Sequence, residues 1–145
     1  MLGHAVTRPM RVVVLSVVML STIGCGSGLF AKAETAMTGC VAARNPLFKA
    51  GQAEQALALP LPAAVETLAT ETAYNFGFKV YREAAKAAET QAELTCALEL
   101  GSHYVDEDVQ VWLSGYLGSP NPPVAAHAKR LLEKQLATLG ARGER

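Results

Sequence analysis

The chain has 145 residues, about half of them hydrophobic, and its 13 basic and 13 acidic side chains leave no formal net charge. This length provides one small domain with a modest hydrophobic core. No basic patch interleaved with aromatic residues occurs, which argues against nucleic acid as a partner. A composition rich in alanine and poor in aromatic residues is typical of packed helices and not of a β-sandwich.

The chain begins with the pattern of an export signal. Arg8 and Arg11 precede an apolar run at 12–20, which is too short for a membrane span of roughly 20 residues. Small residues then lead to Gly24 and Cys25. This pattern resembles the lipobox of bacterial lipoproteins, with Thr22 standing where that family commonly has leucine. The resemblance implies cleavage after residue 24 and a diacylglycerol on the thiol of Cys25.

A lipid on Cys25 would attach the protein to a membrane of the cell envelope, because two or more acyl chains anchor a protein stably. The resemblance also implies the outer membrane where the source has two membranes, since Gly26 replaces the aspartate that commonly retains such proteins in the inner membrane.

An ordinary secretory signal is the alternative. Ala31-Lys32-Ala33 fits an A-x-A cleavage site, and cleavage after Ala33 would release a soluble periplasmic or secreted protein without Cys25. A cytosolic protein with a buried first strand is less favoured, because nothing near Val12 supplies partner strands.

Four regions follow from the lipoprotein interpretation: a signal peptide at 1–24, a lipid-anchored flexible tether at 25–44, a helical domain at 45–140 and a disordered polar tail at 141–145. Removal of the signal takes Arg8 and Arg11 with it, so 13 basic residues become 11 against 13 acidic ones, a net charge of about −2. The tether assignment depends on the Gly, Ala, Ser and Thr that dominate 26–38.

Cys40 and Cys96 are the two cysteines that remain after Cys25 is modified. In an oxidising compartment such a pair is expected to form a disulfide, which would close a long loop and contribute about 4 kcal/mol in the chain-entropy model. Two buried free thiols are the alternative, and the absence of a C-x-x-C spacing argues against a redox-active site.

Apolar residues recur at three- and four-residue steps along the rest of the chain, and no segment alternates like a strand. Asn45, Asp106 and Asn121 are expected N-caps, and Gly101 and Gly140 are expected helix ends. The sequence therefore predicts an all-α bundle of four or five helices. They are expected at 46–59, from 62 to 101 with or without a break at Gly77, at 106–118 and at 121–140.

Trp112 and Tyr116 lie one turn apart on an expected helix and are the candidates for an interaction surface, with core packing favoured for Trp112. The acidic residues near His103 are explained by helix capping, and His127 is expected to be partly buried or at the surface. The sequence shows no motif for nucleophilic, metal or phosphoryl chemistry, so no cofactor and no metal are expected. A pair of catalytic carboxylates needs no fixed spacing and stays open.

The favoured function is that of a non-enzymatic envelope lipoprotein that binds another envelope protein. Its size, helicity and single expected disulfide resemble the pilotins of secretion systems, and accessory lipoproteins of conjugation fit equally. Alanine-rich stripes would also suit a homodimer. The alternative is a soluble exported protein, either an enzyme or a binder of an apolar ligand held among Phe76, Phe78, Tyr81 and Trp112.

Overall fold

The computed structural model describes residues 27–143, which form seven helices and no strand. The expected all-α fold is therefore confirmed. The helices are α2 (Ser27–Lys49), α3 (Ala53–Ala58), α4 (Ala63–Phe76), α5 (Lys79–Ala87), α6 (Gln91–Gly101), α7 (Glu107–Ser114) and α8 (Pro122–Gly143). The signal segment and the lipidation site Cys25 lie outside the described residues.

The helices are more numerous than four or five because glycines divide two expected helices. Gly51 and Gly77 have positive φ angles of 76° and 72°, a backbone conformation that ends a helix and that other residues rarely adopt. Gly51 separates α2 from α3, and Gly77 separates α4 from α5. A third break, at Ala88–Thr90, comes before α6, where Thr90 and Glu93 form a capping box.

The prediction of a flexible tether at 25–44 is wrong for residues 27–44, the part of this range that the structure describes. Helix α2 begins at Ser27 and continues past Pro46, so the helix expected to start there is only its last turn. Small residues at helical spacing explain the difference, because Ala33, Ala36 and Cys40 are fully buried and form one side of a core cluster. The small side chains let α2 approach its neighbours closely.

The C-terminal end of the chain is also more helical than the sequence predicts. Helix α8 does not stop at Gly140 but continues to Gly143, so part of the tail expected to be disordered at 141–145 is helical. Asp106 and Asn121 do mark the starts of α7 and α8 as expected. The Asp106 carboxylate accepts a hydrogen bond of 2.9 Å from the backbone of Asp108.

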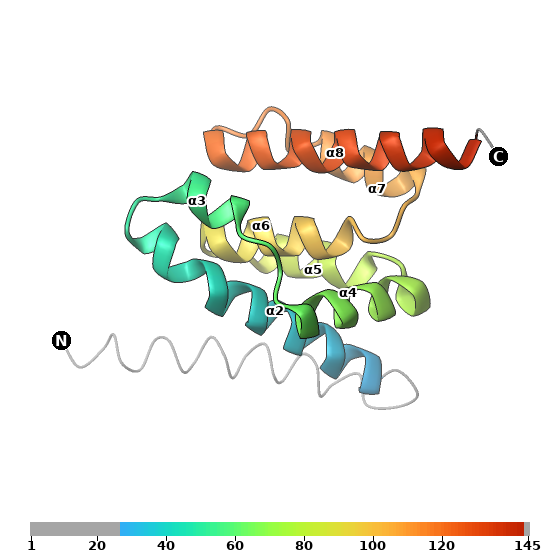
Figure 1. Ribbon diagram of the computed structural model, residues 1–145, viewed down its shortest axis with the longest axis horizontal. Helices are drawn as coiled ribbons and strands as arrows, with labels where there is room; N and C mark the ends of the chain where they lie inside the picture. Colours follow the sequence, from blue (N-terminus) through green and yellow to red (C-terminus); the bar gives the residue numbers. More distant parts are fainter. Residues whose placement is uncertain (1–26, 144–145) are drawn as a thin grey trace.

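The helices form stacked layers, with α2 and α4 on one side, α6 and α5 in the middle, and α7 and α8 on the other side (Figure 1). Helix α6 contributes to both hydrophobic clusters. Cys96 and Leu100 join the cluster with α2 and α4, whereas Leu98 joins the cluster with α7 and α8. The α6 helix is therefore the centre of the fold.

A disulfide joins Cys40 of α2 to Cys96 of α6, with 6.0 Å between the two Cα atoms. Both cysteines are fully buried. The predicted pairing is thus confirmed, and it fastens the N-terminal helix to the central one. Within residues 27–143, no helix combines the length and the apolar character that crossing a bilayer requires.

Candidate functional site

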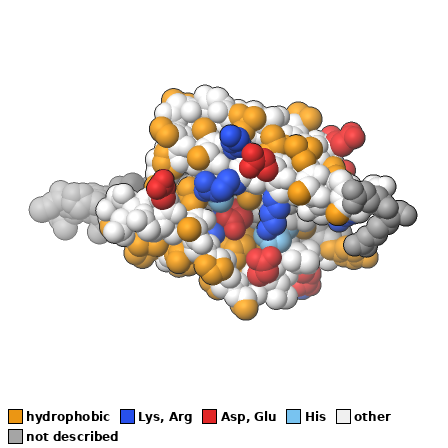
Figure 2. Space-filling model, turned by 45° about the horizontal axis from the view of Figure 1, so that its top comes forward, with side chains coloured by type: hydrophobic (Ala, Val, Ile, Leu, Met, Phe, Trp, Pro, Cys, Tyr) orange, Lys and Arg blue, Asp and Glu red, His pale blue; other side chains and the backbone are white. Residues whose placement is uncertain are grey.

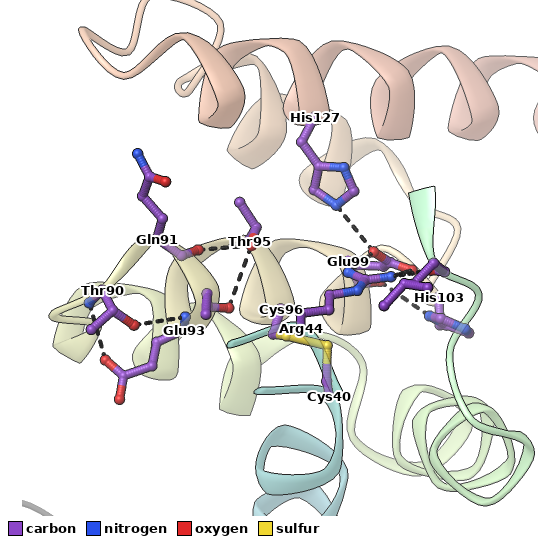
Figure 3. The surroundings of a disulfide bond; sticks show 12 residues. Cys40, Arg44, Thr90, Gln91, Glu93, Thr95, Cys96, Glu99, His103 and His127 are labelled. Atoms are coloured by element: carbon purple, nitrogen blue, oxygen red, sulfur yellow. Dashed lines mark hydrogen bonds and ion pairs between the residues drawn. A yellow bond between two sulfur atoms is a disulfide. The ribbon is translucent and has the colours of Figure 1, made fainter. Parts of the chain in front are cut away.

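A cluster of buried charges surrounds Glu99 on α6, one turn beyond the disulfide (Figure 3). Arg44, which is only 1% exposed, reaches it from α2. Its guanidinium donates to both carboxylate oxygens of Glu99, at 2.5 and 3.2 Å, and to the carbonyl of Leu59 at 2.8 Å. This two-pronged contact fixes α2, α6 and the end of α3 relative to one another.

His127 of α8 completes the cluster from the opposite side of Glu99 (Figure 3). Its Nε2 lies 3.1 Å from a Glu99 carboxylate oxygen, and its Nδ1 lies 3.4 Å from a guanidinium nitrogen of Arg130. The tautomer with hydrogen on Nε2 satisfies both contacts, since the ring then donates to Glu99 and accepts from Arg130. The expectation that His127 is partly buried or at the surface is therefore refined: the side chain is buried and hydrogen-bonded.

Glu99 is held in its ionised form. Burial by itself raises the pKa of this carboxyl group, but the hydrogen bonds from His127 and Arg44 and the positive charge of Arg44 outweigh burial and lower the pKa to about 2. A carboxylate with so low a pKa is a poor proton donor or acceptor near neutral pH. The Glu99 cluster is thus better suited to holding helices together than to acid–base chemistry.

A polar cavity of about 200 Å³ lies next to this cluster, between α8 and the helices beneath it. Figure 2 shows charged and histidine side chains gathered in the middle of this face of the molecule. The cavity is lined by Glu66, Glu99, Ser102, His103, Val105, Leu131, Lys134, Gln135 and Thr138. The cavity therefore brings together two carboxylates, those of Glu66 and Glu99. The sequence had left such a pair open as a possibility.

His103 connects the two carboxylate-bearing helices. Its Nδ1 lies 3.1 Å from the backbone oxygen of Glu99, and its Nε2 lies 2.8 Å from a carboxylate oxygen of Glu66. Both partners accept hydrogen bonds, so the doubly protonated ring satisfies both and the neutral ring only one. The expectation that the acids after His103 serve as a helix cap holds for Asp106, whereas His103 itself pairs with Glu66 of α4.

Gln135 of α8 fastens the turn that joins α6 to α7. Its amide nitrogen donates to the carbonyls of Ser102 and Tyr104, at 2.6 and 2.9 Å, and its oxygen accepts from the backbone of Asp106 at 3.2 Å. The side chain is buried, and these contacts use the donors and the acceptor of its amide. One side wall of the cavity is therefore rigid.

Trp112 and Tyr116 are not a freely exposed pair. Both are partly buried and pack against a core cluster, with their rings 6.3 Å apart and edge to face. The Trp112 ring also lies 5.2 Å from that of Phe78 and covers Gly101 of α6. The structure thus favours the core interpretation of Trp112 over the interaction surface.

The aromatic residues expected to enclose an apolar ligand pack against protein side chains: Phe78, Tyr81 and Trp112 belong to the core clusters, and Phe76 is partly buried. Phe76 packs against Phe30 of α2, with ring centroids 4.9 Å apart, and the Tyr81 hydroxyl lies 2.7 Å from that of Thr72. Phe78 packs on Trp112. None of the four lines the polar cavity.

An apolar groove lies elsewhere, along α8. This outer groove has a volume of about 500 Å³ and is lined by Leu117, Ala125, Ala126, Lys129, Leu132, Glu133 and Leu136. Leu117 and Leu136 are 41% and 52% exposed. Apolar side chains that lie together at the surface and are bordered by polar residues mark interaction sites more often than singly exposed ones do.

Sequence reasoning missed Arg44, Glu99 and Gln135. A signal was present, because Glu99 stands between Leu98 and Leu100, and Arg44 continues the buried spacing of Ala36 and Cys40. A charge on the apolar side of a helix needs a partner of opposite charge. The sequence alone does not identify that partner among so many charged residues.

Among residues 27–143, no three His, Cys, Asp or Glu side chains lie close enough to hold a metal ion. The chain matches no protein-family model, no curated protein and no solved structure.

Proposed function

We propose that this protein is a cell-envelope lipoprotein, anchored in a membrane by lipid on Cys25, which acts by binding another envelope protein and not by catalysis. The observation that carries this proposal is the fully buried disulfide between Cys40 and Cys96. Structural disulfides form in oxidising compartments and are rare in the cytosol. The disulfide thus supports export, which is the first requirement for lipidation.

The position of α2 favours Cys25 over Ala33 as the processing site. Helix α2 begins two residues after Cys25, whereas Ala33 lies inside it and is only 1% exposed. Lys32 also pairs with Glu71 of α4, at 2.5 Å. Cleavage after Ala33 would remove the first two turns of α2 together with this pair, whereas cleavage before Cys25 leaves the helix whole.

Two features support binding over catalysis. The charges of the Glu99 cluster bind one another, and the adjacent cavity of about 200 Å³ is small compared with most ligand sites. The outer groove, by contrast, presents apolar side chains with charged residues beside them. That arrangement is typical of protein interfaces. A role like that of pilotins or of conjugation accessory lipoproteins agrees with these features.

The decisive experiment is the intact mass of the mature protein together with its distribution between membrane and soluble fractions. We expect a mature chain that begins at a lipidated Cys25 and sediments with membranes. The Cys25→Ser variant should move to the soluble fraction or stay unprocessed.

The variant Cys40→Ser/Cys96→Ser is the matched control, since it loses two thiols but keeps Cys25, and it should stay with the membranes. A mature chain that begins at Glu34 would favour the soluble alternative. An unchanged mass and membrane fraction for Cys25→Ser would overturn the proposed anchor.

A further inference from the structure

Helix α8 forms one edge of the described part of the molecule, and no other helix of residues 27–143 lies beyond it (Figure 1). Its buried side carries Val124, Ala128, Leu131 and Gln135. Four residues of the outer groove, Ala125, Lys129, Leu132 and Leu136, follow one another at steps of four, three and four. They therefore form a second stripe along the same helix, beside the buried one.

The outer groove carries one charge of each sign. Lys129 and Glu133 lie one turn apart, both are exposed, and neither forms an ion pair within the part of the chain that the structure describes. A surface with one cation and one anion on a helix is complementary to itself when the second helix runs in the opposite direction.

The sizes of the side chains along the groove also fit an antiparallel pairing of two α8 helices. In an antiparallel pair of α8 helices with its two-fold axis midway between Lys129 and Glu133, each Lys129 faces Glu133 of the second copy. In that register Leu136 faces Ala126 of the second copy, so that a large side chain meets a small one at each end. Leu132 lies near the axis and meets its own counterpart.

From this double match of charge and size we infer that the outer groove binds a second copy of this chain, forming a symmetric dimer with antiparallel α8 helices. The exposed Leu117 and Leu136 are then covered by the partner. Two-fold contacts are the commonest way in which soluble proteins pair. The dimer does not depend on the lipid anchor, so it can be tested separately from the proposed function.

The first test is the molar mass of the full-length processed protein, measured by sedimentation equilibrium in density-matched detergent over a concentration series. We expect a reversible monomer–dimer equilibrium for the wild type. Leu136→Glu should abolish the dimer, whereas Tyr74→Glu should not, since Tyr74 is 88% exposed on α4. A wild type that is monomeric throughout, or a Leu136→Glu variant that dimerises like wild type, would overturn the inference.

Charge exchange tests the antiparallel register. Lys129→Glu places two carboxylates together at each of two symmetric positions, so the dimer dissociation constant should rise about tenfold. The double variant Lys129→Glu/Glu133→Lys restores the pairing and should return the constant to the wild-type value. Failure of this rescue would contradict the register.

Cross-linking provides an independent check at the axis. Leu132→Cys should give a dimer that reductant dissolves on a denaturing gel, in greater yield than Tyr74→Cys or the wild type. Equal yields from Leu132→Cys and Tyr74→Cys would contradict a two-fold axis near residue 132.

Discussion

At the scale of single residues, Glu99 is the most informative side chain, because it binds groups from helices far apart in the sequence. Arg44 lies 55 residues before it and His127 lies 28 residues after it. Removing one member of such a buried pair leaves the other without a partner, which costs about 3–5 kcal/mol. The cluster thus fixes the packing of α2 and α8 on α6.

The Glu99 cluster predicts how stability depends on pH. The pKa of Glu99 is about 2 in the folded protein, against 4.5 for an unperturbed glutamate. Because the pKa of Glu99 is lower in the folded than in the unfolded protein, the ionised side chain stabilises the fold at pH values above the unfolded pKa. This stabilisation, about 3 kcal/mol, is lost as the pH falls from about 4.5 towards 2. Glu99→Gln should be less stable at pH 7 and should lose less stability across this window.

Denaturant unfolding at a series of pH values measures this effect. Glu54→Gln is the matched control, because it makes the same chemical change at an exposed position on α3. If Glu99→Gln retained the acid dependence of the wild type, the assignment of that dependence to Glu99 would be wrong.

At the scale of helices, the N-caps Asp106 and Asn121 were predictable from the sequence, whereas the expected N-cap Asn45 lies inside α2 and the breaks between helices were not predictable. Asp106 and Asn121 precede α7 and α8 as expected, because an N-cap acts on backbone groups two or three residues away. Gly77 is different, since a glycine in a helical pattern either continues or ends the helix. Its positive φ angle depends on how α5 turns to pack against α6, which one sequence does not reveal.

Helix packing makes a sharp prediction at Gly101. A Cβ atom added there would lie 2.7 Å from the Trp112 ring, closer than such atoms tolerate, and 3.2 Å from Tyr81, which is a tight contact. Gly101→Ala should therefore destabilise the protein by about 1–3 kcal/mol, even though alanine is the better helix former.

Gly140 is the matched control for this change, because it also lies in a helix but has open space around it. Gly140→Ala should be neutral or stabilise the protein by up to about 1 kcal/mol. Thermal or denaturant unfolding of both variants gives the comparison, and equal effects would refute the close contact between Gly101 and Trp112.

At the scale of the whole molecule, the disulfide was predictable because the lipoprotein interpretation reserves Cys25 for lipid and leaves Cys40 and Cys96 to pair. The Arg44–Glu99 pair was not, since several cations and anions compete and chain distance does not select among them. The assignment of 25–44 as a tether failed for a related reason: small residues are typical of linkers, but they are also what a tightly packed helix requires.

Loss of the disulfide should destabilise the whole domain. The bond closes a loop between positions 56 residues apart, which corresponds to about 4 kcal/mol in the chain-entropy model. For a domain of this size, Cys40→Ser/Cys96→Ser should lower the melting temperature by on the order of 10 °C.

Thermal melts of this variant and of the wild type, each with and without reductant, measure the contribution. Reductant should lower the melting temperature of the wild type only. Identical curves for all four samples would show that the bond contributes nothing to stability.

Helix α2 begins at Ser27, close in sequence to the proposed lipid-bearing cysteine. If Cys25 carries lipid as proposed, a single residue of sequence lies between that cysteine and α2, a helix of 23 residues and roughly 35 Å, which the Cys40–Cys96 disulfide joins to the rest of the domain. Almost no linker would then join the lipid anchor to the folded domain. The domain would then stay within a thin layer above the lipid headgroups, at a restricted range of tilts, and the proposed partner would have to reach the membrane surface to bind it.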